Sequence, residues 1–197
     1  MYETVLTFWF NELKPAQWWQ KNKALDIKIA RRFGELHHQA CAGELYAWRA
    51  TAEGRLGEII ILDQFSRNIY RDQPQAFAHD GMALVLAQEA TRVGADQALS
   101  PQQRVFLYMP FMHSESIKIH EVGQLLFTQN ADPSQASQSN ESESTSEFEG
   151  AKSSLTYQTV HRDIIQRFGR YPHRNVILGR ESSAEEQAFL KQPNSSF

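Results

Sequence analysis

The side chains best suited to chemistry in this sequence are the basic residues of "RFGRYPHRNVILGRE", residues 167–181. They are Arg167, Arg170, His173, Arg174 and Arg180. A guanidinium group offers a planar fork of donors that matches a carboxylate or a phosphate. Arg174 and His173 lie on a loop beyond a predicted helix end, so we expect them to hold an anion. That anion could belong to a small ligand, to an acidic surface of the same fold, or to the acidic segment at 130–150.

A second basic pair lies in "LDQFSRNIYR", residues 62–71, where Asp63, Arg67 and Arg71 are spaced four residues apart. This spacing places all three on one helical face. An exposed Asp63–Arg67 pair would contribute about 0.3 to 0.5 kcal/mol. Arg67 and Arg71 repel each other at this spacing, which favours either an acidic partner helix or an anionic ligand nearby. The spacing alone leaves both open.

Histidines next to carboxylates suggest an alternative, general acid–base catalysis. An unperturbed imidazole titrates near pH 6.5, so it can exchange protons under physiological conditions. His113 precedes Glu115 by two residues, and His161 precedes Asp163 by the same distance. Either histidine could act as the base and either carboxylate could orient it, with the arginines stabilising developing negative charge.

A metal site at His113, Glu115 and His120 is disfavoured by the spacing of the ligands. The Pro-Cys-x-x-Cys partner that zinc deaminases need is missing. "HEVGQ" at 120–124 also lacks the second histidine of a zincin. We therefore expect no metal and no cofactor.

The elements that must position these residues are helical almost throughout, because the apolar residues recur with helical periodicity. Helices are predicted at 3–12, 22–47, 53–71, 76–93, from Pro101 onward, 114–129, 153–168 and after Ser183. In the helix at 153–168 we expect Tyr157, Val160, Ile164 and Phe168 to face inward, and Gly169 to end it in a left-handed conformation. Pro110 is expected to kink or restart the helix that contains it. The predicted class is all-α, built from antiparallel helix pairs.

One segment, residues 130–152, departs from this pattern. Between 130 and 150 it has six serines, five acidic residues and no Lys or Arg. Such a composition buries too little apolar surface to offset its ordering entropy, so we predict a disordered acidic linker within a single helical domain, 1–197. Outside residues 130–150 the chain has 20 basic and 18 acidic residues, although the whole chain carries a formal net charge of −3.

The amino-acid composition of the whole chain is typical of a soluble protein. No apolar run approaches the roughly 20 residues of a membrane span. A single cysteine, Cys41, cannot form an internal disulfide, which fits a cytoplasmic location, and its expected role is that of a small buried hydrophobe. We expect neither a membrane nor a nucleic acid as partner, and leave a protein partner open.

Four ordered motifs give the chain a family resemblance: "VLTFWF", "LDQFSRNIYR", "PFMHSES" and "HRDIIQRFGRYPHRNVILGRESSAEEQAFL". Together they resemble the domain of unknown function 924 family, bacterial proteins with relatives in eukaryotes. The resemblance covers nearly the whole chain except about residues 130–152. It implies a fold similar to the tetratricopeptide-like helical superfamily, and it supplies no activity, cofactor or catalytic residue.

Three functions follow as hypotheses. The first is a binding protein whose groove holds a small anionic ligand or an acidic peptide. Its expected donors are Arg67, Arg71, Arg162, Arg170, His173 and Arg174. The second is an enzyme that uses a His/carboxylate pair drawn from His113, Glu115, His161 and Asp163. The third is a structural scaffold in which every charge is paired internally.

Overall fold

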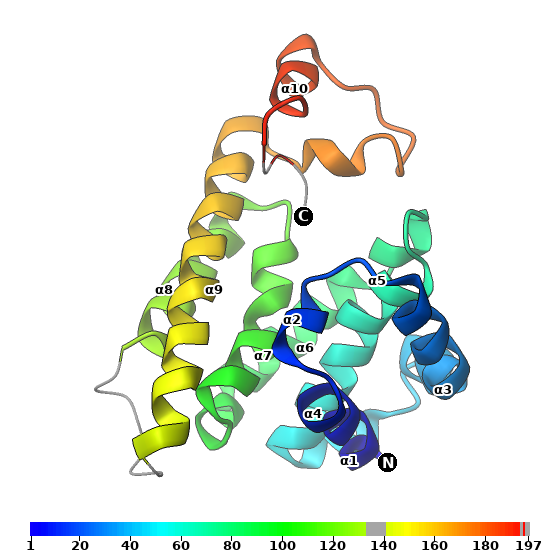
Figure 1. The fold of residues 1–197 in the computed structure, drawn as a ribbon, viewed down its shortest axis with the longest axis vertical. Helices are drawn as coiled ribbons and strands as arrows, with labels where there is room; N and C mark the ends of the chain where they lie inside the picture. The colour runs from blue at the N-terminus through cyan, green and yellow to red at the C-terminus, as the bar shows by residue number, and fades with distance from the viewer. Residues whose placement is uncertain (133–140, 194, 196–197) are drawn as a thin grey trace.

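In the computed structural model of the protein, residues 1–132, 141–193 and 195 are described, with no account of the side chains at 141–146. These residues form helices joined by short turns, without a β-strand among them, which confirms the predicted all-α class (Figure 1). None of the described helices is both long and apolar enough to cross a bilayer.

The helices of the N-terminal half are α1 (Tyr2–Leu6), η1 (Thr7–Glu12), α2 (Pro15–Trp18), α3 (Lys23–Cys41), η2 (Tyr46–Ala50), α4 (Ala52–Ile60), η3 (Ile61–Phe65) and α5 (Ser66–Ile69). Those that follow are η4 (Pro74–Phe77), α6 (Asp80–Arg92), η5 (Ala95–Ala98), α7 (Pro101–His113), α8 (Ile117–Asn130), α9 (Glu141–Phe168), η7 (Pro172–Arg174) and α10 (Ala184–Phe189).

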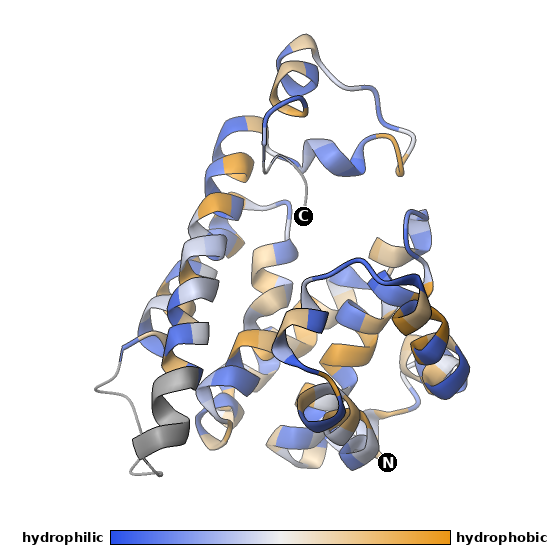
Figure 2. Ribbon diagram, in the orientation of Figure 1, coloured by the Kyte–Doolittle hydropathy of each residue, from blue (hydrophilic) through white to orange (hydrophobic). Residues whose placement is uncertain are grey.

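The main core lies between α1, α3, α4, α6 and α7. The inward faces of these helices carry the apolar residues that form it (Figure 2). Aromatic rings fill its centre. Trp9 packs edge-on against Phe65 and Phe106, with ring centroids 5.6 and 5.5 Å apart. Offset and edge-to-face contacts of this kind add to the energy of burial itself. This core holds the segment around Phe65 in place, and that segment carries Asp63.

Helices α7, α8 and α9 pack side by side in the second half of the chain.

The residues that cap the helices are those predicted from the sequence. Ser100 and Gln103 form a capping box at the start of α7 with Pro101 in the first turn, and Ser183 and Glu186 do the same for α10. At the end of α9, Gly169 has φ +67°, the left-handed conformation expected there.

Several predicted boundaries are wrong. The helix predicted at 22–47 ends at Cys41, because Gly43 has φ +75° and the chain turns there. The helix predicted at 76–93 is split into η4 and α6. Helix α7 does not restart at Pro110 but continues through it to His113.

The inward face of α9 also differs from the prediction. Tyr157 and Val160 are 56% and 39% exposed, while Gln158 and His161 are buried. Ile164 is buried as predicted, and Phe168 packs against it. The part of the face at Gln158 is polar because it packs on α8, where the Gln158 amide nitrogen donates to the His120 carbonyl oxygen at 3.2 Å. A pattern of apolar residues does not identify a helix face that is buried through hydrogen bonds.

Both ends of the segment predicted as a disordered linker, 130–152, are helical in the structure. Asn130 is the buried last residue of α8, and α9 begins at Glu141. Phe148 and Ala151, three residues apart on α9, are buried. This spacing forms a buried helical face, which a composition-based prediction overlooks. Residues 133–140 lie outside the described residues.

Candidate functional site

The candidate site lies where α7 ends and centres on a buried contact between Asp63 and His113. The Asp63 Oδ1 and His113 Nδ1 atoms are 2.7 Å apart, and the Asp63 side chain is only 1% exposed. The Gln64 amide donates to the other carboxylate oxygen, Oδ2, at 2.6 Å. Because a carboxylate only accepts hydrogen bonds, His113 carries its proton on Nδ1. Nε2 is then the nitrogen left to accept a proton.

The local backbone explains why Asp63 points toward α7. Helix α4 passes directly into η3, a π-helical stretch that runs from Ile61 to Phe65. A π-helical turn inserts an extra residue, shifts the side chains around the axis, and occurs often at functional sites. Leu62 and Phe65 remain fully buried in the core. The stretch therefore presents one carboxylate to the interior while its apolar residues keep their packing.

Arginines surround this pair of side chains. Arg67 Nη1 lies 2.6 Å from Asp63 Oδ1, and the same guanidinium donates two hydrogen bonds to Asp80, at 2.9 and 3.0 Å. Arg174 Nη1 makes a longer contact to Asp80, at 3.3 Å. Charges thus alternate in sign along Asp63, Arg67, Asp80 and Arg174. The intrahelical Asp63–Arg67 pair considered from the sequence is present, and it is buried instead of exposed.

Proton affinities in the pair follow from burial and charge. Burial alone would raise the pKa of Asp63, but Arg67 and His113 hold it well below its ordinary value. Burial, and then the charge of Arg67, lower the pKa of His113, and the attraction of Asp63 only partly offsets them. His113 is therefore a neutral imidazole at neutral pH, with a carboxylate behind it.

Helix α7 ends in carbonyl groups that have no partner within the helix, and the C-terminal segment supplies donors to them. The Tyr171 hydroxyl donates to the Met112 carbonyl oxygen, and Arg174 Nη2 donates to that of His113 at 3.1 Å. A positive charge at a helix C-terminus also interacts favourably with the helix dipole. The segment from Tyr171 to Arg174 thus fixes the backbone that carries His113.

Glu115 holds the same segment from the other side. Its carboxylate accepts two hydrogen bonds from Arg180, at 2.7 and 3.0 Å, and a third from the backbone nitrogen of Tyr171, at 2.8 Å. Glu115 therefore does not orient His113, which was one of the arrangements open from the sequence. Its role in the fold is to secure the turn that contains Tyr171.

A pocket of about 340 Å³ opens beside His113. It lies between the end of α7, the start of α6 and the C-terminal segment. Polar groups come from Asp80, His113, Ser114, Glu115 and Arg174, and Phe77, Leu84 and Leu178 give it apolar walls. Pockets that bind small molecules combine an apolar lining with a few polar groups in this way.

The other predicted site residues lie outside this pocket. Arg71 pairs with Asp26 in α3, Arg162 with its neighbour Asp163 at the surface, and Arg170 with Glu186 in α10. His161 Nδ1 bonds to the carbonyl oxygen of Tyr157 in its own helix, at 2.8 Å. His173 packs on the ring of Tyr171, with centroids 5.5 Å apart.

Of the predicted donors, the structure thus brings Arg67 and Arg174 together with the candidate base His113. The sequence did not identify Asp63 as the partner of His113, nor Asp80, Tyr171 and Arg180 as members of the network. Fifty residues separate Asp63 from His113, and no local spacing reports such a contact. Within the described residues, no three His, Cys, Asp or Glu side chains are grouped so as to hold a metal ion.

The comparisons with known proteins agree with the fold. A family model described as "Bacterial protein of unknown function (DUF924)" matches residues 5–194. The chain is also similar to the solved structure of ATU0120, a protein of unknown function from Agrobacterium tumefaciens. Identity is 34%, the TM-score is 0.82, and 96% of each chain is covered. No curated protein matches the sequence significantly. The chain belongs to the DUF924 family.

Proposed function

We propose that this protein is an enzyme that acts on a small molecule, with His113 as the general base and Asp63 as the residue that orients it. The observation that carries the proposal is the 2.7 Å contact between Asp63 Oδ1 and His113 Nδ1 beside a pocket. A carboxylate behind an imidazole fixes the tautomer and stabilises the imidazolium that forms after proton transfer.

Charge balance in the pocket bears on the substrate. Asp80 and Glu115 each have arginine partners, so the lining offers little net charge. Apolar side chains line the same pocket as His113. We therefore expect a substrate with an apolar body and one polar end, at which a proton is removed.

Anion binding, the other hypothesis from the sequence, has weaker support from the same geometry. Arg67, Arg71, Arg170 and Arg174 each contact a carboxylate of the protein itself. An anion would have to compete with these partners. The best place for an anion is beside Arg174, whose contact to Asp80 is a single one at 3.3 Å.

A cytoplasmic location is consistent with the one unpaired cysteine.

A probe that needs only a base and an apolar pocket tests the proposal without knowledge of the substrate. 5-Nitrobenzisoxazole opens its ring when one carbon-bound proton is removed. We expect the protein to accelerate this reaction and His113→Gln to reduce the acceleration by about a hundredfold, the usual contribution of a general base. Glutamine can still donate to Asp63, so the variant keeps that contact.

His38→Gln is the matched control, because His38 is exposed and does not line this pocket. It should retain the wild-type rate. Equal rates for the wild type and a folded His113→Gln variant would contradict the proposal.

A further inference from the structure

Arg174 differs from the other arginines of the site in how its charge is neutralised. Arg67 donates two hydrogen bonds to Asp80, at 2.9 and 3.0 Å, and Arg180 donates two to Glu115, at 2.7 and 3.0 Å. Arg174 contacts a carboxylate once, from Nη1 to Asp80 at 3.3 Å. Its positive charge is therefore only partly neutralised by the protein.

The guanidinium of Arg174 also has donors to spare. Besides the contact to Asp80, Nη2 donates to the carbonyl oxygen of His113 at 3.1 Å. The Nε atom is buried and has no acceptor among the described residues. The rings of Phe77 and Tyr171, with centroids 4.6 Å from the guanidinium, attract its charge but supply no acceptor oxygen. A buried donor without an acceptor is uncommon, and one at the wall of a pocket indicates a place for a ligand.

The pocket beside His113 combines this guanidinium with the proposed base. His113 and Arg174 both line it, and Phe77, Leu84 and Leu178 form its apolar side. Asp63 holds Nδ1 of His113, so Nε2 is the atom that accepts a proton. A substrate in this pocket therefore lies against a proton acceptor and against a cation whose charge is only partly neutralised.

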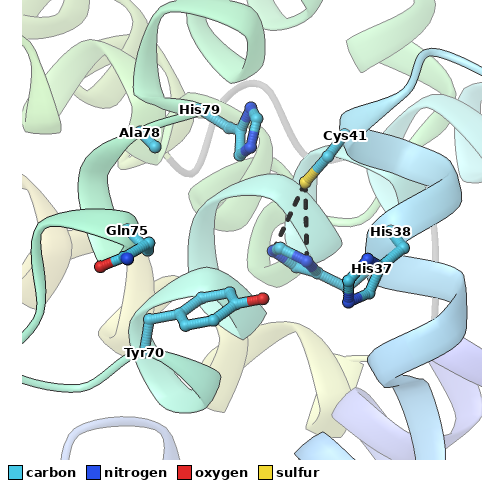
Figure 3. Close-up of a pocket in the computed structure, with 7 residues that line it drawn as sticks. All are labelled: His37, His38, Cys41, Tyr70, Gln75, Ala78 and His79. Carbon is cyan, nitrogen blue, oxygen red and sulfur yellow. Dashed lines mark hydrogen bonds between the residues drawn. The ribbon is translucent and has the colours of Figure 1, made fainter.

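A second cavity, of about 180 Å³, lacks such a cation. Ala78 borders both cavities, and the second is lined by His37, His38, Cys41, Tyr70, Gln75 and His79 (Figure 3). Burial, together with His79 and His38, lowers the pKa of His37 to about 4, so its ring is neutral at neutral pH. Burial raises the pKa of the Cys41 thiol. No arginine or lysine of the described chain lines this cavity, so a negative charge is better accommodated beside Arg174.

We propose that Arg174 binds the oxyanion that forms on the substrate when His113 removes a proton, and that the substrate is a carbonyl compound with an apolar body. The proton comes from the carbon next to the carbonyl group. This inference rests on the proposed function of His113 and adds to it the class of substrate and a second catalytic residue.

The step conserves atoms and electrons. The carbon–hydrogen bond breaks, and its hydrogen passes as a proton to His113 Nε2. The electron pair of that bond forms a carbon–carbon double bond, and a pair of the carbonyl bond moves to the oxygen, which becomes an enolate. Return of the proton from Nε2 to carbon completes the cycle, so no oxidant or reductant is needed.

Both charges that form in this step meet an opposite charge that is already in place. The imidazolium of His113 lies against Asp63, and the enolate oxygen lies against Arg174. Charges fixed in advance where the transition state develops its own charge make a large contribution to catalysis.

The experiment measures how the full-length protein binds 4-nitrophenol. Its phenolate is an oxyanion on an apolar ring, and it absorbs at a different wavelength from the neutral phenol. A cation beside the bound molecule favours the charged form. We expect the pKa of the bound phenol to lie at least about 1 below its value in water, which corresponds to about tenfold tighter binding of the phenolate.

Arg174→Met keeps an unbranched apolar side chain at this position and removes the charge. We expect this variant to bind the phenolate no better than the neutral phenol, while it still binds 4-nitroanisole, which cannot ionise. Arg162→Met is the matched control, because Arg162 pairs with Asp163 and does not line the pocket, and it should keep the lowered pKa of the bound phenol.

The proposal is overturned if 4-nitrophenol does not bind, if the bound phenol keeps the pKa it has in water, or if a folded Arg174→Met variant retains the lowered pKa. The wild-type titration decides the matter even if that variant does not fold. It measures binding and not proton removal by His113, so its failure would leave the benzisoxazole test of His113 unaffected. Failure of the benzisoxazole test would likewise leave the titration unchanged.

Discussion

At the scale of single residues, the site depends on charges that are removed from water and neutralised by each other. The side chain of Arg174 is 8% exposed, and its guanidinium lies 4.6 Å from the ring centroids of both Phe77 and Tyr171. It also contacts Asp80 and the last residue of α7. Removing the Arg174 side chain would leave the His113 carbonyl oxygen without this donor and an unfilled space between the two rings, while Asp80 keeps its pair with Arg67.

Arg174→Ala is therefore expected to lower the free energy of unfolding by about 3 kcal/mol. The variant loses the contact to Asp80, one hydrogen bond at the end of α7 and two ring contacts. Arg162→Ala is the matched control, because its pair with Asp163 is more exposed, and it should cost less than about 1 kcal/mol. Urea denaturation measures both. Similar losses in the two variants would show that Arg174 is not part of the buried network.

At the scale of the elements, the π-helical stretch η3 can hold Asp63 only if α4 enters it in the right position. Helix α4 is fixed at its start by a very close approach. A Cβ atom on Gly54 would lie 2.0 Å from the carbonyl oxygen of Trp48 in η2. Only glycine fits there, because the obstructing atom belongs to the backbone.

Gly54→Ala should therefore destabilise the fold by about 3 kcal/mol or more, since the backbone of η2 or α4 has to move. Gly34→Ala in α3 is the opposite case, because no atom lies within 4 Å of its added Cβ. That change should stabilise the protein by about 0.5 to 1 kcal/mol, the helix preference of alanine over glycine. Thermal or urea denaturation of both variants checks the sign. A neutral Gly54→Ala would mean that α4 is not positioned by this contact.

The same elements show what a sequence can predict here. The capping residues Ser100 and Ser183 and the terminating Gly169 act through neighbours a few residues away, so their helix ends were predicted correctly. Asp63 and His113 meet because α4 and α7 pack on each other, and that information lies in the whole core. The inward face of α9 was mispredicted at Tyr157 and Val160 for a related reason, since the buried residues beside them, Gln158 and His161, are hydrogen-bonded instead of apolar.

At the scale of the whole molecule, buried histidines make the fold sensitive to acid. The pKa of His161 is lowered to about 3 and that of His173 to about 4, in both cases chiefly by burial, and the pKa values of His113 and His120 are lowered too. In the unfolded chain these groups take up protons below about pH 6.5. The folded state resists protonation until the pH is far lower.

Stability should therefore be complete above about pH 6.5 and fall as the pH decreases toward 4, because the unfolded state binds more protons. Each histidine of this kind contributes at most about 1.4 kcal/mol per pH unit. Urea midpoints measured between pH 7 and pH 5 test this before most carboxylates titrate. His161→Gln should reduce the slope, whereas a pH-independent midpoint over this range would show that the histidines take up protons as readily in the folded state as in the unfolded state.

The proposed role of His113 as a neutral base held by Asp63 can be tested through the protonation of its ring, which is directly observable. Two-bond ¹H–¹⁵N NMR spectra of protein labelled with ¹⁵N-histidine report which ring nitrogen carries the proton, and His113→Gln assigns the signals. At neutral pH we predict a protonated Nδ1 and an unprotonated Nε2 for His113. An imidazolium, or a neutral ring with its proton on Nε2, would contradict the assignment of His113 as the base.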